Sequence, residues 1–389
     1  MIESENGDPE GANQSGLADH NARLILTVLR REGALPGADL ARRTGLSPQG
    51  ISTILKRLEG DGLVRRGEPI RGQVGKPRVP LSLAPEGALA LGLKIGRRSL
   101  EMVLLDLTGA IRARREQRHD YPLPGPTVAF ARRMAAELVA EGESAGLDPD
   151  RICGLGVAMP FDLWKWRDHL GAPAGSFDAW RTLDLAAELS HLGPWPITLR
   201  NDVTSATRAE LALGPARAER DWAYLFIGAF VGGGVVIDGR VRDGRRGNAG
   251  ALGSLSVRLP DGGEGQLIDA ASLYLLERAV AGAGAKGEMP ADGWERFGKP
   301  LETWLDRTAR ALAQAALDAC AVVDFQKVVV DGAVPPAVRA ALVGRIAAIL
   351  PGLDHRGLLL PEIEAGTLGT SARAIGAAIA PLEMRHFLI

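Results

Sequence analysis

The stretch "LGLKIGRRSLEMVLLDLTG" (residues 91–109) decides the fold, because its pattern returns as "AYLFIGAFVGGGVVIDG" (residues 223–239). Each stretch is an apolar run, a glycine turn and a second apolar run that ends in aspartate. The turn glycines, Gly96 and Gly228, are 132 residues apart, and so are Asp106 and Asp238. A strand–turn–strand opening used twice predicts two similar lobes with a cleft between them. Two unrelated β-hairpins would give the same pattern, so that alternative stays open.

Around these hairpins, strand-like runs alternate with alanine-rich helical stretches, which is typical of an α/β fold. The chain has 389 residues, 46% of them apolar, which is enough for two or three domains with full cores. Its two cysteines, Cys153 and Cys320, are far apart and predict neither a disulfide framework nor a cysteine metal site. The polar N-terminus is no signal peptide, and no run reaches the ~20 apolar residues of a membrane span. We expect a soluble, cytoplasmic protein.

The charge is unevenly distributed. Residues 20–80 contain twelve Lys or Arg against five Asp or Glu, whereas the rest of the chain is net acidic. We expect a disordered tail over residues 1–16, a compact basic domain over 17–83, a short linker "LAPEG" (83–87) and a two-lobed body over 88–389. A basic module on an acidic body predicts a polyanionic partner at one end.

The basic domain has the pattern of a helix–turn–helix. In "ADLARRTGLSPQGISTILKRLEGDG" (38–62), Gly45 ends one helix, Ser47 is a good N-cap and Pro48 suits the first position of the next helix. The stretch 63–83 then predicts two strands around a glycine-rich tip, as in a winged helix–turn–helix. A small three-helix domain with a solvated charged face is the alternative, and Arg42 and Arg43 fit a solvated surface. The residues that we expect to contact double-stranded DNA are Ser47, Pro48, Gln49, Ser52, Thr53, Lys56, Arg57, Arg71, Lys76 and Arg78.

The winged module, the duplicated body, "NDVTSATRAE" (201–210) and "GNAGALGSL" (247–255) together resemble the ROK family of repressors, open reading frames and kinases. The resemblance covers roughly residues 17–380. It implies a bilobal body with the fold of sugar kinases, actin and Hsp70. Members of the family are sugar kinases or sugar-responsive transcription factors with an added winged helix, and residues 17–83 favour the second group.

The resemblance also indicates the positions at which this chain differs from the kinase motifs. The first phosphate loop is "KIGRR" (94–98), with Lys94 where the kinases have an acid and with Arg97 and Arg98 in place of small residues. The second is "GAFVGGG" (228–234), in which Ala229 and Phe230 replace a threonine and a glycine. A tight strand turn explains the remaining glycines about as well as a phosphate cradle does.

The sugar and zinc motifs of the family are changed further. Ala251 and Ile268 align with sugar-binding glutamates, and Ser254 aligns with the histidine that binds sugar and zinc. The zinc loop is replaced by "DGGEGQLIDAAS" (261–272), which has no cysteine. Zinc needs about four nitrogen or sulfur ligands, so we expect no structural zinc and no other cofactor.

Asn201 and Asp202 match the sugar-binding asparagine and the catalytic aspartate of the family. Without a placed nucleotide and acceptor, a base cannot lower the barrier. We therefore interpret Asp202 as a vestigial catalytic residue that accepts hydrogen bonds from ligand hydroxyls. Active catalysis, or a role in capping the following helix, remain alternatives.

Four tryptophans fall within residues 164–195, where family members bind sugar. An aromatic face with a few polar groups suits a sugar ring. Trp180 is the predicted ligand residue, together with Asn201 and Asp202. Trp164, Trp166 and Trp195 fit a ligand cleft and simple packing equally well.

The sequence as a whole predicts a transcriptional regulator, more specifically a repressor of carbohydrate metabolism. It would bind operator DNA as a homodimer or homotetramer and sense a small sugar or polyol. One alternative is an active ATP-dependent sugar kinase with an accessory DNA-binding domain. The other is a DNA-binding scaffold whose body only oligomerises.

Overall fold

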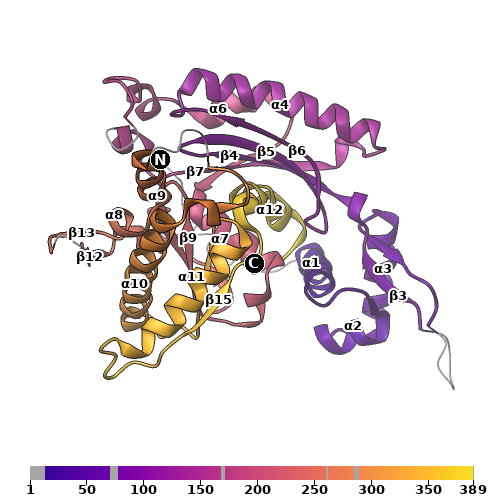
Figure 1. Ribbon diagram of the computed structural model, residues 1–389. Coiled ribbons are helices and arrows are strands. Elements are labelled where there is room, and N and C mark those ends of the chain that lie inside the picture. Colours follow the sequence, from indigo (N-terminus) through magenta and orange to yellow (C-terminus); the bar gives the residue numbers. More distant parts are fainter. Residues whose placement is uncertain (1–13, 71–77, 168–170, 260–261, 284–288, 389) are drawn as a thin grey trace.

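The computed structural model describes residues 14–70, 78–167, 171–259, 262–283 and 289–388, which form an N-terminal domain and two lobes (Figure 1). The N-terminal domain contains helices α1 (Gln14–Glu32), α2 (Gly37–Thr44) and α3 (Pro48–Gly60). Strands β1 (Leu35–Pro36), β3 (Pro80–Leu83) and β2 (Val64–Arg66) form its small sheet in that order. The predicted winged helix–turn–helix is confirmed. The expected tail lies outside the described residues up to position 13, and α1 begins at Gln14.

The turn between α2 and α3 follows from three residues. Gly45 ends α2 with a φ of 70°, a conformation that favours glycine. The Ser47 hydroxyl accepts a hydrogen bond from the Gly50 amide at 3.1 Å, and Pro48 occupies the first helical position. Ile51, Leu55 and Leu58 then face the domain core and leave the opposite face of α3 in solvent.

The first lobe is built on a five-stranded sheet with the order β6-β5-β4-β7-β8. Helix α4 packs on β5 and β6 at its outer face, next to α6. The elements are β4 (Leu89–Ile95), β5 (Ser99–Asp106), β6 (Ile111–Arg118), α4 (Pro124–Ser144), β7 (Ile152–Met159), α6 (Leu185–Leu189) and β8 (Ile197–Asn201).

The second lobe repeats this topology in the order β11-β10-β9-β14-β15. In both sheets the opening hairpin is antiparallel, and its first strand pairs in parallel with the strand that comes fourth in chain order within that sheet, β7 or β14. The prediction of two similar lobes is thus confirmed. The strands are β9 (Trp222–Ile227), β10 (Val231–Ile237), β11 (Arg240–Val241), β14 (Lys327–Gly332) and β15 (Glu362–Ala365), with a separate hairpin of β12 (Ser256–Arg258) and β13 (Glu264–Gln266). The helices are α8 (Ile268–Ala271), α9 (Leu273–Gly282), α10 (Lys299–Val322) and α11 (Pro336–Ile349).

Two helices, α7 (Asp202–Leu213) and α12 (Ala372–His386), fill the space between the two sheets. Helix α12 lies on β4 and β7, and α7 lies on β10. Glycines allow this close approach: a Cβ at Gly156 would stand 1.8 Å from the Ala377 carbonyl oxygen, and one at Gly376 would stand 1.7 Å from that of Ser205. The central layer is therefore packed with backbone close to backbone.

Helix α1 of the N-terminal domain docks on the C-terminal end of α12. The Arg23 guanidinium donates from Nε to the Phe387 carbonyl at 2.8 Å, and the Thr27 hydroxyl accepts from the Leu388 amide at 2.9 Å. Arg30 stacks over the Phe387 ring and pairs with Glu383 at 3.0 Å. The N-terminal domain is thus attached to the body through the contact of α1 with α12. A second link is Arg151 of the body, which donates from Nη1 to the Asp61 carbonyl at 2.7 Å.

No helix in the described part of the chain has an apolar stretch long enough to cross a membrane.

Candidate nucleic-acid interface and interlobe cleft

The solvent face of α3 carries the residues expected to contact DNA. Ser47, Pro48, Gln49, Ser52, Thr53, Lys56 and Arg57 are all exposed. In a helix–turn–helix, the second helix presents this face to base edges in the major groove. The arrangement offers hydroxyl and amide groups near the start of the helix and two cations farther along it.

Two of the expected phosphate contacts are engaged in surface ion pairs. Arg57 pairs with Asp19 of α1 at 3.2 Å, and Arg78 pairs with Asp39 of α2 at 3.2 Å. Exposed pairs of this kind contribute about 0–1 kcal/mol, so a DNA phosphate can replace the carboxylate at little cost. Arg71 and Lys76, which we expect at the tip of the wing, lie outside the described residues.

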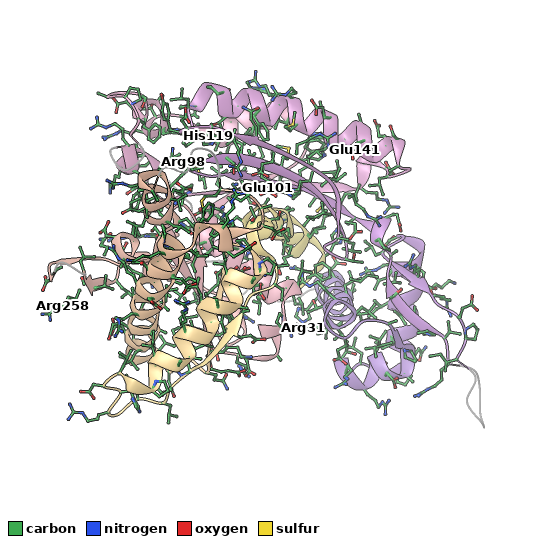
Figure 2. The ribbon with its side chains drawn as sticks, viewed as in Figure 1. Arg31, Arg98, Glu101, His119, Glu141 and Arg258 are labelled. Carbon is green, nitrogen blue, oxygen red and sulfur yellow. The ribbon has the colours of Figure 1, made fainter. Side chains whose placement is uncertain are left out.

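A cavity of about 1370 Å³ opens between the two lobes. Its walls are the β4–β5 and β9–β10 turns, the end of β6, helix α9 and the segments that follow β14 and β15. Figure 2 shows Arg98 and His119 at the end of the first sheet that borders this cavity. The duplicated hairpins therefore bring both candidate phosphate loops to one cleft.

Lys94 occupies the position of the missing acid, and it is only 1% exposed. Its ammonium donates to the Ser99 hydroxyl at 2.6 Å and lies 3.9 Å from the Glu101 carboxylate. Burial, reinforced by the nearby charge of Arg373, lowers the pKa of Lys94 to about 7. An acid that would organise a metal ion is replaced here by a buried cation.

Arg97 joins the two lobes at the mouth of the first loop. Its guanidinium lies 4.9 Å from the centre of the Trp166 ring and 4.6 Å from that of Phe230, which comes from the other lobe. Burial lowers the pKa of Arg97 to about 10, against the opposing charge of Asp202, so the side chain remains cationic at neutral pH. The two bulky residues noted in the sequence, Arg97 and Phe230, thus meet in a cation–π contact.

The glycine run of the second loop belongs to strand β10 and not to a phosphate cradle. A Cβ at Gly232 would stand 2.7 Å from Val203, and one at Gly234 would stand 2.1 Å from the Thr207 hydroxyl. Both contacts are with α7. Close packing of this helix on β10 therefore explains Gly232 and Gly234. A Cβ at Gly233 would stand 2.6 Å from Leu252, and the tight turn considered above contains only Gly228.

The three predicted ligand residues are engaged by neighbouring groups of the protein. Asn201 caps α7, because its side-chain oxygen accepts from the Val203 and Thr204 amides at 2.9 and 3.1 Å. Asp202 is 3% exposed and lies 3.5 Å from Arg373. Trp180 is 5% exposed, and its indole N–H donates to the Pro122 carbonyl. None of the three is among the residues that line the cavity, and their ligand role stays a prediction.

The positions that replace the family's sugar and zinc residues differ in exposure. Ala251 and Ser254 are exposed, whereas Ile268 is buried in the core of the second lobe. Among the described residues, no three or more His, Cys, Asp or Glu side chains are grouped so that they could hold a metal ion.

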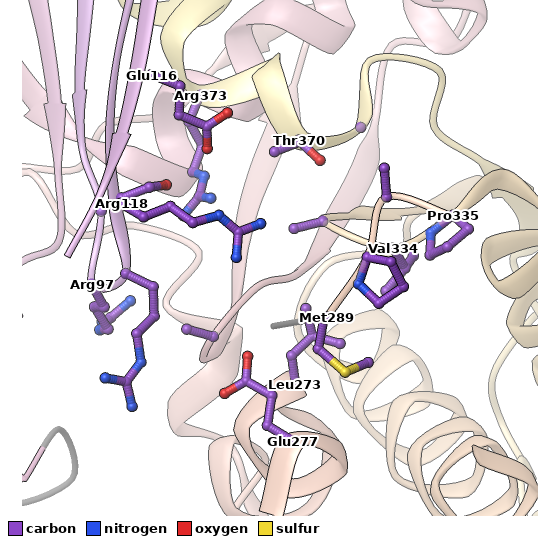
Figure 3. A pocket seen from close by; sticks show the side chains of 18 of the residues that line it. Arg97, Glu116, Arg118, Leu273, Glu277, Met289, Val334, Pro335, Thr370 and Arg373 are labelled. Atoms are coloured by element: carbon purple, nitrogen blue, oxygen red, sulfur yellow. The ribbon is translucent and has the colours of Figure 1, made fainter. Parts of the chain in front are cut away.

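Sequence reasoning missed most of the cavity wall. Arg118 ends β6, Arg373 begins α12, Glu277 lies on α9 and Arg339 lies on α11. Figure 3 shows Arg118 projecting into the cavity from the strand side, with Glu277 on the helical wall. Lys94, Arg97, Arg98 and Ala229 did have a signal, because they depart from the residues of the family's phosphate loops.

The comparisons with known proteins agree with this architecture. The model of the ROK family matches residues 90–382, and that of the MarR family matches residues 15–72. The chain is 26% identical over 376 residues to the uncharacterized protein y4fQ of Sinorhizobium fredii, covering 94% of this chain and 92% of that protein. It is 22% identical over 256 residues to the DNA-binding transcriptional dual regulator NagC of Escherichia coli, covering 64% and 61%.

A solved structure extends the comparison to the whole fold. The crystal structure of a ROK family transcriptional regulator, a homolog of the E. coli MLC protein, matches with a TM-score of 0.68. The match covers 95% of this chain and 97% of that chain at 19% sequence identity. At this identity the likeness concerns the fold alone, and it includes both the N-terminal domain and the two lobes.

Proposed function

Because the chain belongs to the ROK family and carries a MarR-like winged helix, we propose that it is a DNA-binding transcriptional repressor that senses a small carbohydrate. The winged helix recognises an operator through α3 and the wing. The two-lobed body binds the effector and joins two or four copies on a palindromic site.

The observation that carries this proposal is the path of α12. At its first turn, Arg373 lines the interlobe cavity and contacts Asp202. At its last turn, Glu383 pairs with Arg30 of α1. The two residues are ten positions apart, about 15 Å along a helix. One helix, with Pro381 in its interior, therefore touches both the cleft and the DNA-binding domain.

Buried charges extend this connection to the second lobe. Glu383 also pairs with Arg208 of α7 at 2.7 Å, and Arg208 lies 3.5 Å from Asp243. Asp243 in turn pairs with Arg200 at 2.7 Å. A ligand that changes the angle between the lobes must shift α7 or α12, and α1 follows because it is bound to Glu383. Such a ligand acts only through different affinities for the two arrangements.

The first phosphate loop supports the loss of kinase activity. A nucleotide needs a metal-organising acid and space for its phosphates, and Lys94 and Arg97 occupy these positions. Asp202 keeps a ligand role in this proposal. A carboxylate has about four acceptor sites, and only the Val203 amide and Arg373 use them among the described residues.

The test is fluorescence anisotropy on the DNA upstream of the protein's own gene and its neighbours, with a salt titration and a panel of sugars and polyols. We expect specific binding that falls steeply with salt and changes with one sugar. ATP consumption is measured in the same preparation. Sugar-dependent ATP turnover without DNA binding would overturn the proposal in favour of a kinase. Specific DNA binding that no compound alters would favour the alternative of a DNA-binding scaffold whose body only oligomerises.

Substitutions test whether the exposed face of α3 is the DNA-binding surface. Lys56→Ala removes a phosphate contact on the exposed face of α3, and we expect it to weaken operator binding and reduce the salt slope by about one. Lys165→Ala, an exposed lysine of the body, is the matched control. Equal affinities of the two variants would refute the assigned face.

A further inference from the structure

We propose that Arg97, Trp166 and Phe230 form a latch between the two lobes, which holds the lobes at the angle found in the structure until the effector changes that angle. The contact itself depends only on how the two lobes pack. Its consequence for operator binding rests on the proposed function.

The latch consists of one cation and two aromatic rings. The Arg97 guanidinium lies 4.9 Å from the centre of the Trp166 ring and 4.6 Å from that of the Phe230 ring. The centres of the two rings are 5.2 Å apart. Arg97 and Trp166 belong to the first lobe and Phe230 belongs to the second. The contacts of Phe230 with the other two members therefore join the lobes directly.

The second lobe fixes the position of Phe230, which is 4% exposed. The Val231 amide, next in the chain, donates to the Ser272 hydroxyl at 2.9 Å, and the Tyr274 amide donates to the Ala229 carbonyl at 3.3 Å. The Tyr274 ring packs nearly perpendicular to the Phe230 ring, with the ring centres 5.3 Å apart. Phe230 is thus bound to the start of α9 and moves with the second lobe.

The first lobe fixes the other two members. Arg97 lies at the tip of the β4–β5 hairpin, which is closed by a hydrogen bond from the Gly96 amide to the Ser99 carbonyl at 2.9 Å. The indole N–H of Trp166 donates to the Phe161 carbonyl at 3.3 Å. Because each side of the latch is attached to its own lobe, a change in the lobe angle must separate the rings or slide them past each other.

The energetics of Arg97 make this contact reversible. Within the described part of the chain, Arg97 forms no ion pair and no hydrogen bond, and its buried Nε has no partner. Burial lowers the pKa of Arg97 to about 10, and the charges of Asp202 and Arg373 act on it in opposite directions. Loss of hydration therefore opposes the latch, whereas the two rings favour it, since a cation–π contact strengthens when water is excluded. A contact with opposing contributions of this kind can be broken by the coupling energy of a small ligand.

The latch borders the interlobe cavity. Arg97 lines the cavity from the first lobe, and Ala229 and Leu273, which flank Phe230 in space or in sequence, line it from the second. Figure 3 shows Arg97 on the strand side of the cavity and Leu273 on the helical side. A ligand that enters the cavity and changes the lobe angle must therefore open the latch, and α7 and α12, packed between the sheets, respond to the same change.

The first experiment measures the distance between the lobes in the full chain. Spin labels are attached at Arg132→Cys on α4 and at Arg356→Cys in the second lobe, both exposed positions. Cys153 and Cys320 are buried, and burial raises the pKa of both thiols, so they stay unlabelled. Double electron–electron resonance is recorded after dilution with unlabelled protein, so that only distances within one copy contribute.

Arg97→Gln and Phe230→Leu each remove the cation–π contact, and Phe230→Leu keeps an apolar side chain in its place. We expect a second interlobe distance whose population, relative to the first, is about tenfold that of the wild type. Arg296→Gln is the matched control, because it removes a cation–π contact of 5.1 Å with Phe297 inside the second lobe. Folding of each variant is checked by circular dichroism. Wild-type distances in both folded latch variants, or an equal change in Arg296→Gln, would overturn the proposal.

The second experiment measures operator binding by the unlabelled variants across the panel of sugars and polyols. A latch variant spends less energy on the change of angle, so we expect its apparent Kd for the effector to fall by up to about tenfold. Operator binding with a sugar response and unchanged lobe distances refutes only the latch. Changed lobe distances in a protein that binds no operator refute only the regulator. Changed distances with an unaltered effector response refute the role of the latch in regulation.

Discussion

Replacing the buried Lys94 by methionine should stabilise the protein and remove a specific pH dependence. Methionine has a similar length and no charge, so the apolar part of the side chain still fills its space between β4, β5 and α12. The Glu101 carboxylate keeps Arg114 and the Ser371 hydroxyl as hydrogen-bond partners, both at 2.7 Å. The change therefore removes one buried cation. Arg114 and Ser371 still bind Oε1 of Glu101, whereas Oε2 loses the Lys94 ammonium at 3.9 Å.

The magnitude follows from the pKa. Burial lowers the pKa of Lys94 from 10.5 to about 7. The unfolded chain thus binds more protons than the folded chain between these values. The loss of folding stability that the buried charge of Lys94 causes is nearly complete below pH 7 and disappears as the pH rises toward 10.5. A shift of this size corresponds to about 4–5 kcal/mol at pH 6.5 and to about 2 kcal/mol at pH 9.

The assay is urea unfolding of wild type and Lys94→Met at pH 6.5 and pH 9. We expect the stability advantage of the variant to fall by about 2–3 kcal/mol between the two pH values. Lys165→Met, at a lysine that is 68% exposed, is the control and should show no such dependence. If the advantage of Lys94→Met were the same at both pH values, the buried lysine would not be the titrating group.

Three further predictions concern the central layer and the second lobe. Burial and the charge of Asp331 raise the pKa of Glu210 from 4.5 to about 7, so stability is lost as the pH rises between these values. Glu210→Gln should therefore raise the free energy of unfolding by about 1–3 kcal/mol at pH 8 and leave it unchanged at pH 4.5, as measured by urea unfolding. An equal increase at both pH values would refute the reasoning. Glu383→Gln leaves the Arg30 guanidinium without its carboxylate, and it should lower the free energy of unfolding by about 3–5 kcal/mol. It should also weaken any effector response in the anisotropy assay. An unchanged response would mean that α12 does not transmit the effect of the ligand. Gly234→Ala would force a Cβ against Thr207 and should lower the free energy of unfolding by about 1–3 kcal/mol even without any phosphate ligand. Unchanged stability would favour the phosphate-cradle interpretation again.

Much of the fold could be predicted because its signals are local. The helix–turn–helix depends on Gly45, Ser47 and Pro48, whose conformational preferences act within a few residues. The lobes could be predicted because each opens with a hairpin that has its own apolar pattern and glycine turn. A pattern repeated 132 residues later needs no knowledge of tertiary contacts.

The ligand cleft could be predicted only in part. Comparison of the loop residues indicated that Lys94 and Arg97 are unsuited to a kinase, and both do line the cavity. The predicted ligand residues Asn201, Asp202 and Trp180 contact neighbouring backbone or Arg373, and their ligand role stays a prediction. The helix cap, considered only as an alternative, is what the Asn201 side chain forms.

What the sequence by itself determined is therefore the set of elements: a winged helix–turn–helix, two duplicated lobes and a damaged first phosphate loop. The tertiary structure alone decided which charges meet. Arg97, Arg118 and Arg373 come from the first hairpin, the end of β6 and the start of α12, and α1 reaches Glu383 across more than 350 positions of sequence. The physical reason is that hydrogen bonds of turns and caps act between near neighbours along the chain, whereas ion pairs and cavity walls depend on distances in space. Only the packing of α7 and α12 between the two sheets sets those distances.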